Sequence, residues 1–400
     1  MPPRLLLALP QLPQDPSSGA ARSVRTIAEF AQQAGFEVRC VATTATERAQ
    51  KTGTVPYLKS MEIEPRAARV PGGAFRTFKF SHRGIHYTTL DTGNLRLDKW
   101  QNTHGRQFDK LFDYELETFQ PNILLTYGGL SADQARIHRA RLKHCRIALC
   151  VYNLAYFGSG RLFDEVDAVI TPSAFLARKY RDAIGLESIP LPDPIDEDEV
   201  ISPERDPIFV TMVNPSIEKG LFFFARLAEE LCRREPKIAV LAIESRGTAG
   251  MVVGAGAAGG FDLRRHENLM IAGVVPKPRD IYTNTRVLIA PSVVEEASGR
   301  VVSEALVNGV VPIVGDRGGL AEMCRGAGFV LPLPADLTLQ SRRPVDADAV
   351  EPWVEVIRKL AFDHAFYEDA VTKVKAAAVE CSAKRMRKRY RDFFEGLMAR

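Results

Sequence analysis

Residues 291–306 read PSVVEEASGRVVSEAL, and the order of residue types in this stretch decides the fold. The apolar run before it predicts a strand that ends at Ala290. A polar loop then holds Glu296, and a helix is expected to begin near Ser298 and Gly299. A strand, a loop and a helix in this order form the repeating unit of a parallel α/β sheet.

The same alternation extends in both directions from this unit. In the second half of the chain, strands are expected at 208–213, 238–243, 269–272, 287–290 and 311–314, with helices at 219–233, 279–283 and 299–307. In the first half, strands are expected at 5–9, 38–41, 123–126, 147–151 and 168–171, with helices that begin at 20 and after 173. This alternation predicts parallel sheets with helices on both faces.

The domain organisation follows from the length and from one Pro-rich run. The chain has 400 residues, more than one hydrophobic core usually organises, so two domains are expected. The run IPLPDP at 189–194 is expected to break all regular structure and is the best candidate linker. We therefore expect two facing Rossmann-like, doubly wound α/β domains at 1–190 and 191–375, followed by a basic helix over 376–400.

Two segments carry weaker patterns. Between about 47 and 110 only short strands are indicated, at 75–80 and 86–90. The Gly-rich segment 247–260 is expected to be a loop, and both a mobile lid and a variable insertion fit its composition.

The composition excludes several classes of protein. With 46% hydrophobic and 26% charged residues the chain matches soluble globular proteins, and a net charge of +4 is too mild to indicate nucleic acid binding. No apolar run reaches the roughly 18 residues that span a bilayer, and the run at 5–9 is too short for a secretory signal, so a cytoplasmic protein is expected. Six scattered cysteines without metal-ligand spacing predict free thiols and no metal site.

The two glutamates of residues 291–306, Glu296 and Glu304, suggest a site for a ligand with a diphosphate and a diol. Glu296 and Glu304 are eight residues apart, so the first precedes the helix and the second lies on its second turn. Free N–H groups near Ser298 and Gly299 suit a diphosphate, and a carboxylate such as Glu304 can bind a vicinal diol. The alternative is that these glutamates are solvated charges on an amphipathic helix.

This stretch resembles the E-x7-E signature of retaining nucleotide-sugar glycosyltransferases of family 4, also called glycosyl transferases group 1. The segments NGVVPIV at 308–314 and GGLAE at 318–322 continue the match, which runs without a gap from about 282 to 322. The resemblance implies the GT-B architecture, a C-terminal helix that returns to the N-terminal domain, retention at the anomeric carbon and no metal or other cofactor. It also implies an N-terminal acceptor domain, a C-terminal donor domain and a UDP-, GDP- or ADP-sugar as donor.

A second match lies at VNPSIEKG, residues 213–220, where the family places a diphosphate-binding lysine. Lys219 opens a predicted helix, against the preference of the helix dipole for anions there, which favours a functional role. The family commonly carries an arginine shortly before this lysine, whereas this chain has Asn214 near that position. Arg300, or Arg22 from the other domain, is a candidate replacement.

The N-terminal domain carries weaker matches. The run SSGAAR at 17–22 lies where the family has a Gly-rich loop near the donor phosphates and the acceptor, and only Gly19 survives there. Gly19 is equally suited to a plain helix N-terminus. Many relatives place a histidine where this chain has Asn153, which can form hydrogen bonds but supplies no proton. Arg22 and Asn153 are thus candidate acceptor ligands.

The resulting hypothesis is a transferase that uses electrostatic stabilisation. Glu304 binds the ribose, Lys219 and the N–H groups near Ser298 and Gly299 bind the diphosphate, and Glu296 lies near the transferred sugar. Glu296 and Lys219 are the predicted catalytic residues of a hexosyltransferase. Its acceptor is a glycan, a lipid or lipid-linked glycan, or a small molecule. Two rivals stay open: a sugar-nucleotide epimerase of the same fold, and a catalytically silent sugar-nucleotide-binding protein.

Six cations lie within residues 384–391, and six large apolar side chains recur at helical spacing within the last 18 residues. One interpretation is a helix that lies on an anionic membrane, which leaves a weak peripheral membrane contact open. The other is a terminal helix whose apolar side packs on the N-terminal domain while its cations are solvated. We favour the docked helix, because any surface helix needs such amphipathicity.

Overall fold

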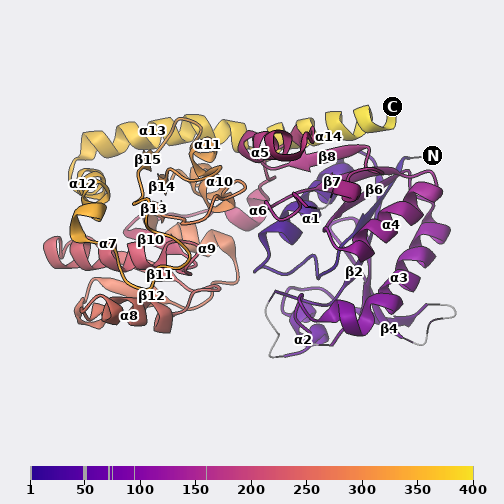
Figure 1. Cartoon of the computed structure of the whole chain (residues 1–400), viewed down its shortest axis with the longest axis horizontal. Helices are drawn as coiled ribbons and strands as arrows, with labels where there is room; N and C mark the ends of the chain where they lie inside the picture. Colours follow the sequence, from indigo (N-terminus) through magenta and orange to yellow (C-terminus); the bar gives the residue numbers. More distant parts are fainter. Residues whose placement is uncertain are drawn as a thin grey trace. The chain divides into compact units, whose positions relative to one another are not determined.

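A computed structural model describes residues 2–47, 52–70, 73, 75–93, 95–158 and 160–399. The chain divides into two compact units. The first consists of Met1–Pro172, Ala177–Pro194 and Met386–Arg400, and the second consists of Ser173–Leu176 and Ile195–Arg385. Each unit is built around its own β-sheet (Figure 1).

The sheet of the first unit has nine strands in the order β3-β4-β5-β2-β1-β6-β7-β8-β9. Its strands are β1 (Arg4–Ala8), β2 (Glu37–Thr43), β3 (Arg66–Arg69), β4 (Arg76–His82), β5 (Ile85–Leu90), β6 (Ile123–Tyr127), β7 (Arg146–Cys150), β8 (Ala168–Thr171) and β9 (Ile189–Pro190). Only the pairings of β4 with β3 and β5 are antiparallel. The direction in which the chain adds strands reverses at β1, which has β2 on one side and β6 on the other.

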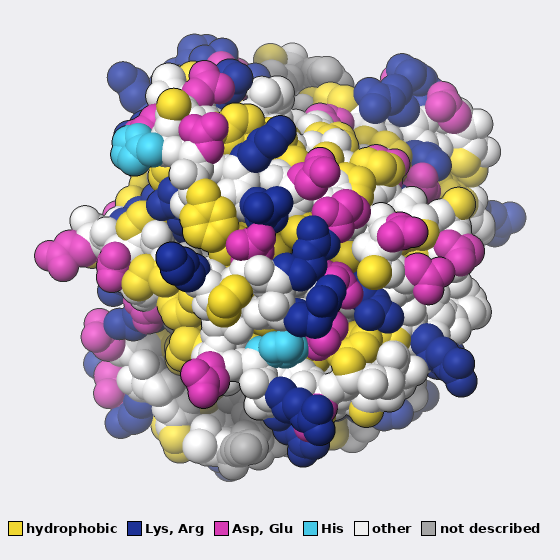
Figure 2. Space-filling view, turned by 90° about the vertical axis from the view of Figure 1, so that its left-hand side faces the viewer, with side chains coloured by type: hydrophobic (Ala, Val, Ile, Leu, Met, Phe, Trp, Pro, Cys, Tyr) yellow, Lys and Arg dark blue, Asp and Glu magenta, His cyan; other side chains and the backbone are white. Residues whose placement is uncertain are grey.

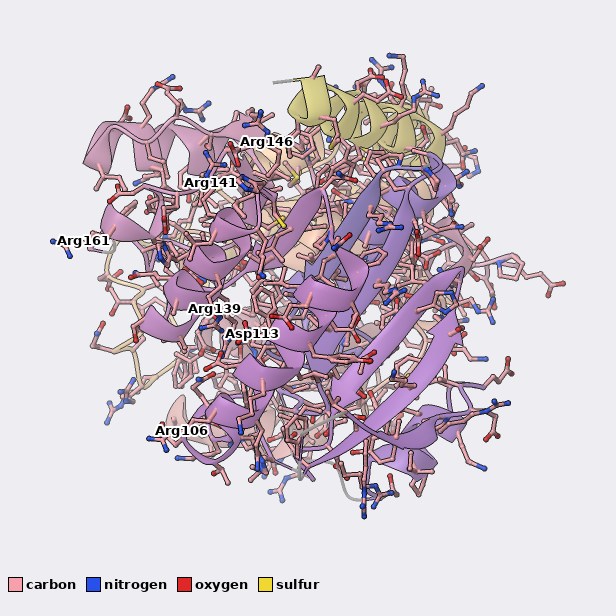
Figure 3. All side chains as sticks on the ribbon, turned by 90° about the vertical axis from the view of Figure 1, so that its right-hand side faces the viewer. Arg106, Asp113, Arg139, Arg141, Arg146 and Arg161 are labelled. Carbon is pink, nitrogen blue, oxygen red and sulfur yellow. The ribbon has the colours of Figure 1, made fainter. Side chains whose placement is uncertain are left out.

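Helices cover both faces of this sheet, as the fully buried Leu5, Leu6 and Leu7 of β1 require. The helices are α1 (Gly19–Gln33), α2 (Thr54–Lys59), α3 (Trp100–Phe119), η1 (Gly160–Leu162), α4 (Ser131–Leu142) and α5 (Ala174–Ile184), whose first three residues count with the second unit. An ion pair of 2.7 Å between Asp113 and Arg139 joins α3 to α4, and both residues are labelled in Figure 3.

The C-terminal helix α14 (Ala383–Ala399) completes the first unit from Met386 onward. Its apolar side chains Met386, Tyr390, Phe394 and Leu397 are all buried. The ring of Tyr390 lies 6.3 Å from that of Phe30, on α1. Most of the helix's cations are exposed. Of the two interpretations, the docked helix is therefore confirmed, because the apolar side of α14 packs within the first unit.

The sheet of the second unit has six parallel strands in the order β12-β11-β10-β13-β14-β15. They are β10 (Phe209–Val213), β11 (Val240–Ile243), β12 (Leu269–Ala272), β13 (Thr285–Ala290), β14 (Val311–Gly315) and β15 (Phe329–Leu331). The chain first adds β11 and β12 on one side of β10 and then β13, β14 and β15 on the other. The strand order therefore reverses between β10 and β13.

Two hydrophobic clusters lie on opposite faces of this sheet. The helices of the unit are α6 (Glu197–Val200), α7 (Leu221–Arg234), α8 (Ala249–Ala258), η2 (Leu263–Arg265), α9 (Pro278–Thr283), α10 (Arg300–Val307), α11 (Leu320–Cys324), α12 (Ala347–Phe362) and α13 (His364–Cys381). On β13, Val287 packs into the cluster with α7 and α12, whereas Leu288 packs with α9 and α10. This alternation along a strand is the pattern of a sheet covered on both faces.

Two expectations are wrong. The Gly-rich segment is not a loop, because α8 occupies Ala249–Ala258. Thr248 caps this helix, and buried Val252 and Ala255 pack in the main cluster of the unit, which offsets the low helix propensity of its glycines. The Pro-rich run also keeps some regular structure, since β9 pairs with β8 at the edge of the sheet. Proline is tolerated at an edge, where no N–H is needed on the outer side.

The longest helix of the first unit was missed. The segment around α3 is predicted to hold only short strands, yet Phe108, Leu111, Phe112, Leu116 and Phe119 are buried along one side of this helix. Their spacing of three or four residues is the signal that identifies it. The polar residues between these apolar positions hide the helical periodicity when only a few consecutive residues are considered.

The surface carries both signs of charge. Cations and anions are interspersed in the view of Figure 2. Ion pairs of this kind join α7 to α12, with Arg234 bound to Glu351 and Arg358 bound to Glu235. Among the described residues, no helix is both long and apolar enough to cross a membrane.

Candidate functional site

The topology of the second unit locates a candidate site without reference to side chains. In open α/β sheets, ligands bind beyond the carboxyl ends of the strands, at the point where the strand order reverses. Here that point lies between β10 and β13. The loops that follow these two strands are 214–220 and 291–299, which contain most of the predicted donor ligands.

The two loops touch through their backbones. The N–H of Val293 donates a hydrogen bond of 2.9 Å to the carbonyl of Glu218. Gly220 has a φ of +93°, and a Cβ at this position would collide with the carbonyl oxygen of Pro291. Only glycine combines this backbone conformation with so close an approach. The loops are therefore held together by main-chain contacts.

Lys219 and Glu296 meet across this junction. The Lys219 Nζ donates to Glu296 Oε1, and Ser292 Oγ donates to the same oxygen at 2.7 Å. The side chain of Lys219 is 29% exposed and that of Glu296 is 14% exposed, so both are partly accessible to solvent. The structure thus brings the two predicted catalytic residues together, 77 positions apart in sequence. An anion that enters the crevice competes with Glu296 for the ammonium group.

The start of α10 is shaped for close approach. Gly299, the N-cap residue, has a φ of +115° and carries no side chain to cap the helix. No acidic residue lies in the first turn. The start of a helix of this kind suits a bound phosphate, because its first N–H groups have no partner within the helix. Ser298 precedes this turn and is buried.

A backbone contact also fixes the loop that contains Glu296. The N–H of Gly319 donates to the carbonyl of Glu296 at 2.8 Å. Gly318, with a φ of +71°, lies so close to the main chain of Glu296 that a Cβ would collide with it. The GGLAE segment thus has a physical role, since its two glycines let the neighbouring loop pack against Glu296.

Glu304 is buried on α10, with only 3% of its surface exposed. Tyr282 donates its hydroxyl to Glu304 Oε2 at 2.9 Å, and Arg300 Nε donates to Oε1 at 2.8 Å. Arg300, a candidate phosphate ligand, therefore contacts Glu304 in this structure. Tyr282 was not singled out from sequence, because nothing in the 22-residue separation marks the two as neighbours.

Asn214 has a structural use next to the site. It adopts a left-handed conformation with a φ of +61°, and its Oδ1 accepts a hydrogen bond of 2.8 Å from the N–H of Gly247. This bond joins the loop after β10 to the loop after β11. Asn214 was predicted to bind the donor, and in this structure its side-chain oxygen accepts this hydrogen bond within the chain.

The hydrogen bond between Asn214 and Gly247 places the loop after β11 next to the site, and this loop contains a cation that sequence analysis missed. Arg246 precedes Gly247 and is exposed. Although burial alone would raise it, hydrogen bonds and the charges of Arg246 and Lys219 hold the pKa of Glu218 below its usual value. Arg246 therefore adds positive charge beside Lys219. The sequence signal for Arg246 is its position in the loop after β11, the strand that pairs with β10.

The remaining predicted residues belong to the first unit. Gly19 begins α1 directly after the N-cap Ser18, and a Cβ on it would meet nothing within 4 Å, as at an ordinary helix start. Arg22 is buried on the first turn of α1. Asn153 is exposed, and its Oδ1 accepts from the N–H of Ala155 at 2.8 Å.

The thiols and acidic groups form no metal site in the described part of the chain, where no three His, Cys, Asp or Glu side chains gather. All six cysteines are free and buried, as expected. Burial raises the pKa of Cys150 and of Cys324 to about 12, so these thiols stay protonated.

Two Rossmann-like units, each with a strand-order reversal, and a C-terminal helix that returns to the first unit define the GT-B fold. The predicted fold class is therefore confirmed. No family model matches the chain, and no curated protein does. Solved structures do match along the whole length.

Three of these structures are glycosyltransferases of this fold. Sucrose-phosphate synthase from Thermosynechococcus elongatus has a TM-score of 0.69 and 16% identity, over 99% of this chain and 100% of that chain. The catalytic domain of Starch Synthase IV from Arabidopsis thaliana, bound to ADP and acarbose, has a TM-score of 0.70 and 13% identity, over 100% and 99%. HepE from Anabaena in complex with UDP-glucose has a TM-score of 0.66 and 12% identity, over 98% and 99%.

Proposed function

We propose that this protein transfers a sugar from a nucleotide-sugar donor to an acceptor with retention of the anomeric configuration. The observation that carries the proposal is the Lys219–Glu296 pair at the strand-order reversal of the second unit, in the loops that precede α7 and α10. The solved structures of the same fold support it, since two of them hold ADP or UDP-glucose. The donor is a UDP-, GDP- or ADP-sugar.

The diphosphate is assigned to the cationic part of this crevice. Lys219 and the N–H groups of the first turn of α10 stabilise the negative charge that grows on the leaving diphosphate. Arg246 supplies further positive charge from the neighbouring loop. This preorganised arrangement accelerates departure of the nucleotide without a protein nucleophile.

The two glutamates are assigned to hydroxyl groups of the donor. Glu304 binds the ribose diol through its carboxylate, whose position Tyr282 and Arg300 hold by hydrogen bonds. Glu296 binds hydroxyl groups of the transferred sugar once the diphosphate has drawn Lys219 away. In front-face attack the leaving phosphate oxygen accepts the proton of the acceptor hydroxyl, so no further base is required.

The epimerase alternative needs acid and base groups at the sugar. None of the seven histidines lies in the loops that follow β1, β6, β10 or β13. Incubation of the donor alone separates the two, because an epimerase returns an isomerised sugar nucleotide and a transferase returns at most the free nucleotide.

A thermal-shift panel of UDP-, GDP- and ADP-glucose tests the proposal first. A bound donor raises the melting temperature by mass action, and Glu304→Ala is expected to reduce the shift at the same donor concentration. Released nucleotide, measured with and without acceptor, then tests catalysis. No shift with any nucleotide sugar contradicts the proposed function, and a shift without any release indicates a silent binding protein.

A further inference from the structure

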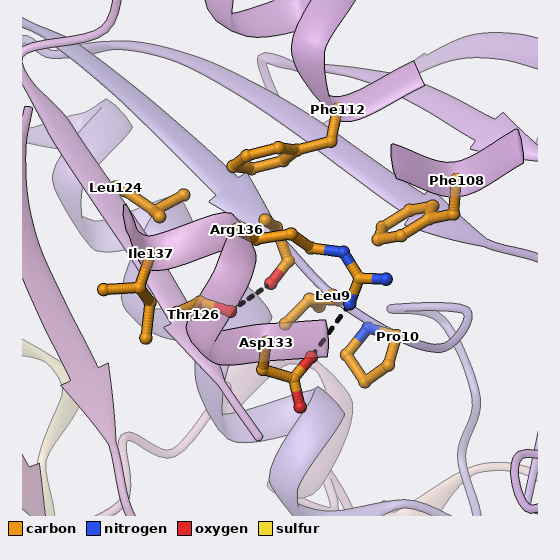
Figure 4. A pocket seen from close by; sticks show the side chains of 10 residues that line it. Leu9, Pro10, Phe108, Phe112, Leu124, Thr126, Asp133, Arg136 and Ile137 are labelled. Atoms are coloured by element: carbon orange, nitrogen blue, oxygen red, sulfur yellow. Dashed lines mark hydrogen bonds and ion pairs between the residues drawn. The ribbon is translucent and has the colours of Figure 1, made fainter. Parts of the chain in front are cut away.

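Two cavities of this protein differ greatly in size. The cavity of Figure 4, in the first unit, is about 10 Å³, room for no more than a water molecule, and Arg136 binds Asp133 beside it at 2.9 Å. Another cavity, in the second unit, has a volume of about 450 Å³. This volume is within the usual range of sites for small molecules.

The larger cavity lies at the amino edge of the six-stranded sheet. Its lining residues come from α7, from α8 and from the segment 260–266, which leads from the end of α8 toward the start of β12. A helix that follows a strand of a parallel sheet runs back to the amino edge, so the loops with Lys219 and Arg246 lie at the far ends of these two helices. The donor is assigned to the carboxyl edge, and a ligand of this cavity is therefore a different molecule.

The charged side chains of the cavity are engaged to different degrees. Arg264 binds both carboxylate oxygens of Asp262, at 2.8 and 2.9 Å, and Nε2 of His266 lies 2.7 Å from Oε2 of Glu229. Arg265 is exposed, and its side chain has no hydrogen bond in the part of the chain that the structure describes. The hydrogen bonds of Arg264, assisted by the charge of Arg265, hold the pKa of Asp262 at about 2. The carboxylates are thus bound, whereas the guanidinium of Arg265 is available to an anion.

The cavity also has an apolar wall. Val253 and Ala257 are four residues apart on α8 and lie on the same face of this helix. The ring of Phe261 lies 4.7 Å from the guanidinium of Arg226, and a Cβ on Gly259 would collide with the same ring. Phe261 is therefore held between α7 and the main chain, and offers a fixed surface to the body of a ligand.

We propose that this cavity binds a phosphate monoester, either a sugar phosphate or a nucleoside monophosphate, and that the bound ester acts as an effector of donor binding. Three consecutive residues, 264–266, line the cavity with nitrogen-bearing side chains. Donors on several side chains suit the tetrahedral oxygens of a phosphate, and the guanidinium group binds such oxygens well. Ala257 and Phe261 contact the sugar or the base. Only the effect on the donor rests on the proposed function.

The two helices give the cavity a connection to the donor loops. α7 begins two residues after Lys219 and carries Glu229, and α8 begins three residues after Arg246 and carries Ala257. The two helices also contact each other. An ester that contacts both restricts their relative motion and preorganises the loops with Lys219 and Arg246. Donor binding then has a smaller ordering cost, so the ester should strengthen it.

Calorimetry in the absence of donor tests the binding site. Glucose 6-phosphate and AMP are the two ester probes and show which of the two kinds of ester binds, and methyl α-glucoside is the neutral control. Arg265→Gln should raise the Kd of the ester roughly 10- to 100-fold, the effect of losing one charge-assisted hydrogen bond. Arg178→Gln is the matched control, since Arg178 is an exposed arginine on α5, and it should leave this Kd unchanged.

Donor titrations with and without saturating ester test the effector role. The ester should lower the donor Kd about 5-fold or more, the lower end of common coupling between sites. This effect should persist in Arg178→Gln and disappear in Arg265→Gln at the same ester concentration.

Each contrary result has a distinct meaning. The site is overturned if neither ester binds, if methyl α-glucoside binds as tightly, or if Arg265→Gln leaves the ester Kd unchanged. It is also overturned if Lys219→Met weakens the ester as much as Arg265→Gln does, because the ester then occupies the donor crevice. An unchanged or raised donor Kd overturns the effector role. If no nucleotide sugar binds, the proposed function itself fails, and the calorimetry of the ester still decides whether the cavity is a site.

Discussion

The two strand-order reversals of this protein have opposite chemistry. At the reversal of the second unit, charged side chains are paired with each other, Lys219 with Glu296 and Arg300 with Glu304. At the reversal of the first unit, neutral side chains such as Gln14 and Tyr127 have buried atoms without partners in the described chain. The two units share a topology and differ in what their loops offer a ligand.

The difference shows two ways to prepare a binding site. A charged site cannot leave its groups unpaired, because an isolated buried charge costs far more than an unpaired amide. Its internal ion pairs hold the side chains in place until a ligand exchanges one partner for another. A neutral site can leave donors and acceptors unpaired at a smaller cost to folding, and the ligand then recovers that cost.

Removal of the Lys219 charge should break the second site most severely. Lys219→Met is expected to lower the turnover of bound donor about 100- to 1000-fold, the usual effect of losing one group that stabilises the departing charge. The donor Kd should change much less, because the charge on the diphosphate grows in the transition state. Single-turnover rates and calorimetry measure the two quantities.

Lys237→Met is the control for this variant, since Lys237 is exposed in the connection that precedes β11, at the opposite end of the sheet. Equal losses in turnover and in affinity would assign Lys219 to ground-state binding alone.

A methyl group at Gly220 should disrupt the same site through the backbone. Gly220→Ala is expected to reduce the free energy of unfolding of the second unit by about 3 kcal/mol, from left-handed strain and displacement of the Pro291 carbonyl. Gly254→Ala is the matched control, because Gly254 lies inside α8 with nothing within 4 Å of its Cβ position. It should stabilise the unit by about 0.5–1 kcal/mol.

Urea unfolding followed by circular dichroism measures both glycine variants. Equal midpoints for the two would show that the loops after β10 and β13 do not need their close contact.

Loss of the buried Glu304 carboxylate should weaken donor binding by a moderate amount. Glu304→Ala is expected to cost about 1–3 kcal/mol of donor binding, because it leaves the ribose hydroxyls without a partner. Tyr282→Phe should cost less, since Arg300 still holds the carboxylate. Calorimetric titration with the donor measures both, and an unchanged Kd for Glu304→Ala would remove the ribose assignment.

The smallest effect on donor binding is expected from substitution of the exposed Arg246. Arg246→Ala should weaken donor binding by about 1 kcal/mol at low salt and less at high salt, as for other solvent-exposed charge interactions. Arg264→Ala is its control, because Arg264 is paired with Asp262 on η2. Titrations at two ionic strengths measure the effect, and a salt-independent loss would mean that Arg246 acts through packing.

The strands and helices of the fold could be predicted where the pattern is local. The strands β8 and β12 begin and end at the predicted residues, 168–171 and 269–272, because both are short apolar runs between turn residues. The helix α8 could not be predicted in this way. Its glycines indicate a loop, and only packing against α7 outweighs their low propensity.

The candidate site also has a part that could be predicted from local sequence and a part that could not. The spacing of Glu296 and Glu304 and the position of Lys219 are readable from the chain, because each lies at a strand-to-helix junction. Whether they act as proposed stays a prediction. The partners of these residues were not readable, since Tyr282 and Arg246 come from other junctions of the sheet.

By itself, the sequence determined the alternation of strands and helices in both units, the parallel pairing that goes with it, and the strand-to-helix junctions that carry Lys219 and Glu296. Hydrophobic periodicity and turn residues act over a few positions, and strand order then follows from the short connections of α/β folds. Only the tertiary structure decided which polar groups are paired and which are not. Pairing depends on distances between loops that are remote in sequence, and those distances exist only once the sheets have formed.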